Sequence, residues 1–195
     1  MNDKKTQPTD GRRLRSTVSR AKIVAALHEL VEAGDLEPSA EAVAEKAGVG
    51  LRSVFRHFND MESLRAEMAY EVEARLLEEA KTPFRGETLL EKFDDVVDRR
   101  SRAFERSMAL RRAGLTQVHR SKVLRDNSQR LNQVLRARME SLLPPHILAD
   151  RTRVEMLDLG LSWESWIRLR NVQNLSVEDA RKVFAALVRL TLPQE

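Results

Sequence analysis

The segment that most constrains the fold of this chain is SAEAVAEKAGVGLRSVFRHF, residues 39–58, which contains a helix cap, a glycine stop and a second helix. The Ser39 hydroxyl can accept a hydrogen bond from a backbone N–H of the next turn, and Val43 and Ala47 continue an apolar face at helical spacing. We expect this helix to end at Gly48, because a left-handed residue costs little only without a Cβ. The pattern predicts two short helices joined by a tight turn.

The second helix is expected to begin near Leu51 and to present two arginines to solvent. Arg52 and Arg56 lie one turn apart on one side of it, together with Ser53. The positions expected to face inward are Val54, Phe55 and Phe58. Two guanidinium groups on an exposed helix suit the edges of guanine in the major groove of DNA, so the pattern favours a DNA-reading helix.

This arrangement resembles the helix-turn-helix of the tetracycline-repressor (TetR) family of bacterial transcriptional regulators, over about residues 17–65. The residues that carry the resemblance are Ala44, Ala47, Gly48, Val49, Ser53, Val54, Phe55, His57, Phe58 and Leu64. Three positions depart from the family, with Gly50 in place of Ser or Thr, Phe55 in place of Tyr, and Met61 in place of a common Lys. Each departure removes a polar group at a position that often contacts phosphate in the family.

We therefore expect a DNA interface made of the helix-turn-helix and the basic N-terminus. Its predicted residues are Ser39, Gly50, Leu51, Arg52, Ser53, Phe55, Arg56 and His57, with Arg12, Arg13 and Arg15. Arg52 and Arg56 are expected to read bases, while Ser53 and His57 place the helix on phosphates. Residues 1–16 show no apolar periodicity, so they are expected to form a mobile basic arm that reaches the minor groove.

The distribution of charge makes such an arm useful. The net charge of the chain is +4, but residues 23–80 carry five Lys and Arg against thirteen Asp and Glu. Residues 1–22 carry seven basic residues against two acidic ones. An acidic region is repelled by DNA unless basic groups elsewhere offset its charge. The only charged residues within 46–58 are Lys46, Arg52 and Arg56, which keeps the predicted reading surface itself positive.

Every periodic segment of the chain is helical and none alternates as a strand would, so the expected fold class is all-α. We expect a helix-turn-helix domain over residues 17–65, joined by a helix to about residue 81, and a helical domain over residues 82–195. Within the latter, Ala113-Gly114 is expected to separate two helices, and residues 151–171 are expected to form one helix.

The resemblance implies that the second domain binds a ligand and dimerises through its last two helices. The residues predicted to line the pocket are Phe93, Val97, Arg100, Phe104, Leu124, Asn127, Leu131, Trp163 and Trp166, with Arg100 or Asn127 as the polar anchor. Those predicted at the dimer interface are Val183, Phe184 and Leu187. Two alternatives remain open: the tryptophans can be core or interface residues, and the basic run over residues 111–138 can be a solvated face or can attract an anionic effector.

Other classes of function lack their sequence signatures. The chain has no cysteine and its four histidines are scattered, so we expect no metal and no cofactor. It also lacks a glycine-rich phosphate loop and a recognisable Ser/His/Asp arrangement, so we expect no catalytic residues. No apolar run has the length of a membrane span, and we expect a cytoplasmic protein. The overall expectation is a homodimeric repressor, released from a pseudo-palindromic double-stranded DNA operator by a small-molecule effector of unknown identity. The alternative is a helical adaptor or ligand-binding protein whose helix-turn-helix no longer binds specific DNA.

Overall fold

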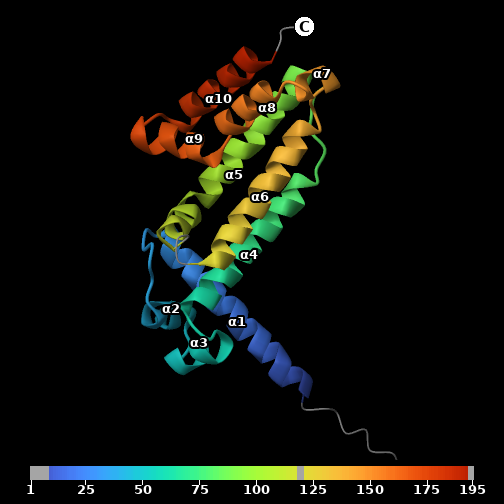
Figure 1. Cartoon of the computed structure of the whole chain (residues 1–195). Coiled ribbons are helices and arrows are strands. Elements are labelled where there is room, and N and C mark those ends of the chain that lie inside the picture. The colour runs from blue at the N-terminus through green and yellow to red at the C-terminus, as the bar shows by residue number, and fades with distance from the viewer. Residues whose placement is uncertain (1–8, 118–120, 193–195) are drawn as a thin grey trace, which may run out of the picture. The chain divides into compact units, whose positions relative to one another are not determined.

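The computed structural model describes residues 9–117 and 121–192, which form ten α-helices, one π-helical turn and no strand (Figure 1). The elements are α1 (Thr9–Glu32), α2 (Ala40–Ala47), α3 (Leu51–His57), α4 (Met61–Ala80), α5 (Leu89–Gln117), α6 (Lys122–Glu140), α7 (Pro145–Leu148), α8 (Arg151–Gly160), α9 (Trp163–Ile167), η1 (Arg168–Val172) and α10 (Val177–Thr191). The expected all-α class is confirmed.

The chain divides into two compact units. The first contains the residues up to Val72 together with Ala109–Arg125, and the second contains Glu73–Met108 and the residues from Asp126 onward. Helices α4, α5 and α6 therefore each contribute to both units. The domain ranges expected from the sequence, 17–65 and 82–195, remain a prediction.

The core of the first unit joins α1 to the two short helices that follow it. Ile23 and Leu27 of α1 are fully buried, and they share one apolar cluster with Val43 of α2, Val54 of α3 and Leu64 of α4. Since burying one large aliphatic side chain contributes about 1.5–3 kcal/mol, this cluster is enough to fix the position of α3 against α1. The apolar faces of α1, α2 and α4 thus pack together and support α3, a helix of seven residues.

The core of the second unit is aromatic. Phe93 and Phe104 of α5, Trp163 and Trp166 of α9, and Phe184 of α10 are all buried in one cluster with aliphatic side chains from α6 to α8. The Phe104 and Trp163 rings meet edge to face with centroids 5.6 Å apart, and Trp166 meets Phe184 in the same way at 5.0 Å.

Three boundaries predicted from the sequence are wrong. Helix α1 already begins at Thr9, so residues 9–16 of the expected arm are helical, while residues 1–8 lie outside the described residues. Helix α5 runs through Gly114 to Gln117 because an isolated glycine weakens a helix without ending it. The single helix expected over residues 151–171 is divided at Ser162, whose Oγ accepts a hydrogen bond from the Ser165 N–H and begins α9.

Candidate nucleic-acid interface

The turn between α2 and α3 has the geometry that the sequence predicts. The Ser39 Oγ accepts a hydrogen bond from the Ala42 N–H at 3.2 Å and caps α2. Gly48 has φ 65° and ψ 35°, the left-handed conformation, and the Val49 N–H bonds to the Ala44 carbonyl at 3.0 Å. The predicted cap and glycine stop are confirmed, and they set the direction in which α3 leaves the turn.

Helix α3 buries one side and exposes another. Val54 and Phe58 are 1% and 3% exposed and hold the helix on the core. Arg52 and Arg56 are exposed on the far side, and the Arg56 Nη2 donates to the Ser53 Oγ at 3.3 Å. The expectation that Phe55 faces inward is wrong, because its ring is 47% exposed. The solvent-facing side of α3 therefore carries two guanidinium groups and an aromatic ring.

Arg20 holds the end of α3 in place. Its Nη1 donates to the His57 carbonyl oxygen at 2.7 Å, its Nε donates to Glu67 Oε1 of α4 at 3.1 Å, and its guanidinium lies 4.3 Å from the centroid of the Phe58 ring. Three helices meet at this one side chain. In the sequence, Arg20 stands out only as one of the seven basic residues of residues 1–22. The signal that was missed is its place on α1, one turn before the buried Ile23.

His57 is less available to DNA than its sequence position suggests. Its side chain is half-buried, and its Nε2 is enclosed without a hydrogen-bond partner within the described residues. Burial and the nearby charges of Arg56 and Arg20 lower the pKa of His57. The side chain is therefore neutral near pH 7, and its Nε2 is turned away from solvent.

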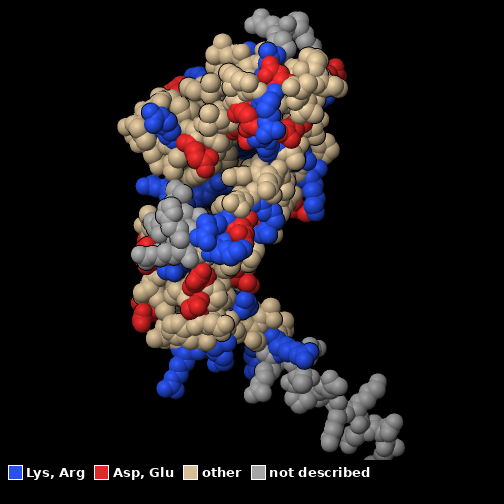
Figure 2. Space-filling model, viewed as in Figure 1, with Lys and Arg blue, Asp and Glu red and all other residues tan. Residues whose placement is uncertain are grey.

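Most of the remaining residues predicted to contact DNA are exposed to solvent. Ser39 and Gly50 are exposed, and Gly50 precedes α3 without a side-chain cap. Arg13 and Arg15 are exposed on α1, whereas the side chain of Arg12 lies outside the described residues. Figure 2 shows Lys and Arg side chains projecting from the end of the first unit at which α3 lies.

Comparisons with solved structures agree on the fold. A transcriptional regulator of Rhodococcus sp. Rha1 superposes with a TM-score of 0.71 at 18% identity, over 89% of this chain and 96% of that protein. A second Rhodococcus protein, assigned to the TetR family, gives 0.66 at 15% identity over 89% and 98%. The chain has the TetR-type fold.

A TetR transcriptional regulator of Rhodococcus sp. RHA1 further supports this assignment, with a TM-score of 0.57 at 19% identity over 91% of this chain and 97% of that protein. No protein-family model matches the sequence, and no curated protein does either. The likeness is thus one of structure, and it covers both units of the TetR-type fold.

Five of the predicted pocket residues lie in one apolar cluster of the second unit, and three others lie outside that cluster. Phe93, Val97, Phe104, Trp163 and Trp166 lie together in the aromatic cluster of the second unit. Leu124 belongs to the first unit, while Leu131 is buried on α6 and Asn127 Oδ1 accepts a hydrogen bond from Arg130.

Polar groups are held inside or beside this aromatic cluster. Arg100 is buried and donates to the backbone carbonyls of Leu161 and Leu135, each at 2.8 Å, and its burial lowers its pKa to about 10. Glu105 Oε1 accepts hydrogen bonds from the Trp166 Nε1 at 2.8 Å and the Arg170 Nε at 2.9 Å. A neutral indole and a cation therefore share one carboxylate.

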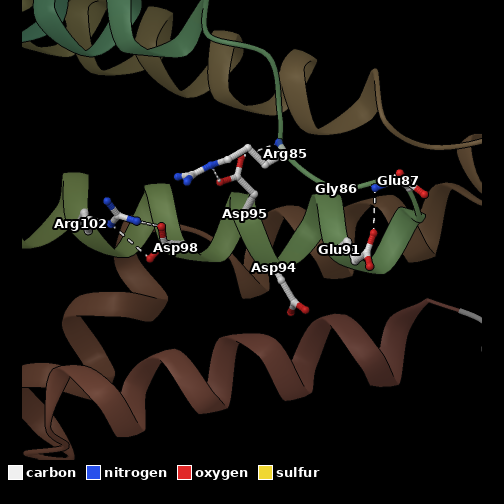
Figure 3. A pocket seen from close by; sticks show the side chains of 8 residues that line it. All are labelled: Arg85, Gly86, Glu87, Glu91, Asp94, Asp95, Asp98 and Arg102. Carbon is white, nitrogen blue, oxygen red and sulfur yellow. Dashed lines mark hydrogen bonds and ion pairs between the residues drawn. The ribbon is translucent and has the colours of Figure 1, made fainter.

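A hollow of about 720 Å³ opens beside α5, but its lining is charged rather than apolar (Figure 3). Two of its acids each have two ionic partners: Asp95 pairs with Arg85 and Arg99, and Asp98 pairs with Arg102 and Arg181. Within residues 9–117 and 121–192, no three His, Asp or Glu side chains are gathered as a metal site requires. No described helix is both long and apolar enough to cross a membrane.

The predicted dimer residues differ in exposure. Phe184 is fully buried within the chain and Val183 is half-buried, so Phe184 is a core residue of the protomer. Leu187 is 37% exposed. The large apolar side chains that face solvent on α8 and α10, and that the sequence analysis missed, are Met156, Leu159 and Leu190. They were not predicted because the apolar periodicity of a helix identifies its buried face, and these three side chains lie outside that face.

Proposed function

We propose that this protein is a transcriptional regulator that binds double-stranded DNA as a homodimer at a pseudo-palindromic operator. The observation that carries the proposal is the exposed face of α3, where Arg52 and Arg56 stand one turn apart on a helix fixed by a buried opposite face. Bidentate contact of arginine with guanine is the commonest specific contact in the major groove. A second support is that solved proteins with this fold are transcriptional regulators.

The apolar surface of the second unit supports the homodimer. Leu159 of α8 is 69% exposed and Leu190 of α10 is 83% exposed, while Met156 and Leu187 add to the same two helices. Helices α8 and α10 pack on each other, and Gly160 faces the Leu187 side chain. An apolar surface on two adjacent helices is suited to a second copy of the chain. A dimer would place two α3 helices on half-sites about 34–36 Å apart or a multiple of it.

We also propose that a small molecule releases the DNA, so that the protein acts as a repressor. The support is the aromatic cluster around Trp166, which has Arg100 and Glu105 as polar groups inside or beside it. A ligand that binds there replaces hydrogen bonds that these two side chains make within the chain. A ligand that binds better to a conformation with misaligned α3 helices lowers DNA affinity by its differential affinity for the two conformations.

Selection of bound fragments from genomic DNA tests the proposal directly. The full chain should enrich a pseudo-palindromic sequence, and a variant with both Arg52→Ala and Arg56→Ala should not. The alternative is a helical adaptor or ligand-binding protein whose helix-turn-helix has lost specific binding. That alternative predicts no enrichment above random fragments for either protein, and this result would overturn the proposal.

The effector is best sought through tryptophan fluorescence. The chain has two tryptophans, Trp163 and Trp166, and both lie in the aromatic cluster. A compound that releases the operator by binding there should change their emission with the same concentration dependence. Release of DNA without any change of emission would place the effector site elsewhere.

A further inference from the structure

Helix α3 exposes an apolar pair beside its arginines. Leu51 is 37% exposed and Phe55 is 47% exposed, and neither belongs to the apolar core of the first unit. Single exposed apolar residues are ordinary on protein surfaces. These two lie one turn apart on a seven-residue helix whose attachment to the core is supplied by Val54 and Phe58. Packing within the unit therefore does not account for them.

The helical geometry places Phe55 next to the arginines and Leu51 on the far side of Phe55 from them. At about 100° per residue, the order around the helix axis is Leu51, Phe55, Arg52 and Arg56, with steps of about 40°, 60° and 40°. The two apolar residues are separated by about 6 Å along the axis. A helix that turns Arg52 and Arg56 toward base edges in the major groove thus turns Phe55 toward them as well, with Leu51 at the edge of the same arc of about 140°.

The major groove of DNA offers only one apolar group that such a pair of side chains can contact. The major-groove edges of the bases carry hydrogen-bond donors and acceptors, and the only apolar group among them is the 5-methyl of thymine. A phenyl ring and a leucyl side chain offer no hydrogen bond, so an adenine or cytosine amino group covered by them would lose its partner in water. A thymine methyl loses nothing and gains an apolar contact.

We propose that Leu51 and Phe55 recognise thymine methyl groups in each operator half-site, next to the base pairs read by Arg52 and Arg56. This inference rests on the proposed function, because it concerns the same helix in the same groove. It adds that the operator is specified partly by methyl groups. With α3 aligned along the groove, the roughly 6 Å between Leu51 and Phe55 would correspond to about two base-pair steps between the two thymines.

Replacement of thymine by deoxyuridine tests this inference without altering any hydrogen-bonding group. Each thymine of the selected operator is replaced singly, in both half-sites at once, and dissociation constants are measured with the wild-type chain. Loss of one buried methyl should weaken binding about fourfold per half-site, so about fifteenfold for the symmetrical pair. The effect should occur at one or two positions and vanish in Phe55→Ala or Leu51→Ala, whichever side chain covers that methyl.

Both side chains are exposed, so these variants should fold, and a thermal melt checks that they do. Leu148→Ala, an equally exposed apolar residue of α7, serves as the matched control and should retain the full effect of deoxyuridine. Tight operator binding that ignores every deoxyuridine would overturn the inference and leave the proposed function standing. A deoxyuridine effect that persists unchanged in both alanine variants would assign the methyl to another residue. Absence of any sequence-selective binding would instead overturn the proposed function itself.

Discussion

Replacement of Arg20 by alanine should loosen the recognition helix rather than remove a DNA contact. The side chain supplies a charged hydrogen bond to the His57 carbonyl, a contact with the Phe58 ring and an ion pair with Glu67. A hydrogen bond from a charged group contributes about 1.5–3 kcal/mol, and a partly exposed cation–π contact about 0.5–1 kcal/mol. The ion pair adds less than about 1 kcal/mol because both of its side chains are more than a third exposed.

We therefore expect Arg20→Ala to lower the free energy of unfolding by about 2–5 kcal/mol. Urea denaturation at one fixed protein concentration measures this change, since the stability of a dimer depends on its concentration. Arg20→Lys should fall between the wild type and the alanine variant, because an ammonium can donate to the His57 carbonyl but cannot reproduce the guanidinium fork. Arg13→Ala, which removes an exposed arginine of the same helix, should leave the free energy of unfolding unchanged within about 0.5 kcal/mol.

The salt dependence of operator binding separates the two possible roles of Arg20. A side chain that neutralises one phosphate contributes about 0.9 to the slope of log affinity against log salt, so a dimer would lose about 1.8. If Arg20 only positions α3, the affinity of the alanine variant falls while the slope stays unchanged. Unaltered stability together with a reduced slope would refute the reasoning, because Arg20 would then be a phosphate contact.

Three further predictions concern other parts of the protein. Arg13→Ala combined with Arg15→Ala should flatten the salt slope of DNA binding by about two to four for a dimer, and an unchanged slope would mean that α1 does not reach DNA. The lowered pKa of His57 means that the unfolded chain takes up a proton first as the pH falls, so stability should decrease below pH 6.5. In a His57→Phe variant this decrease in stability should be smaller. Identical profiles of stability against pH for the variant and the wild type would contradict a lowered pKa of His57. Leu190→Glu should sediment as a monomer while Leu148→Glu remains a dimer, and a dimeric Leu190→Glu protein would place the interface elsewhere.

The sequence predicts the helix-turn-helix well because its signals are local. Ser39 needs only the next turn to act as a cap, and Gly48 needs only its own left-handed backbone to stop α2. The cap of α4 is equally local, since Asp60 Oδ1 accepts a hydrogen bond from the Ser63 N–H at 2.7 Å. Such features can be predicted without knowledge of the tertiary structure.

Features that depend on tertiary contacts could not be predicted in this way. Phe55 is exposed because Val54 and Phe58 already fill the space between α3 and the core, and hydrophobicity alone does not reveal this competition. The role of Arg20 depends on partners 37 and 47 residues away along the chain. Residues 13–18 of α1 are all exposed, so the helical conformation of this part of α1 leaves no apolar period in the sequence.

The central claim is that the exposed face of α3 reads bases through its two arginines. The most direct measurement compares Arg52→Ala and Arg56→Ala with the wild type on the selected operator and on operators with each base pair changed. Each substitution should cost about 1–3 kcal/mol of binding free energy and should remove the preference at one base pair while preserving it at the others. Unchanged affinity and unchanged preference at every position in both variants would contradict the claim.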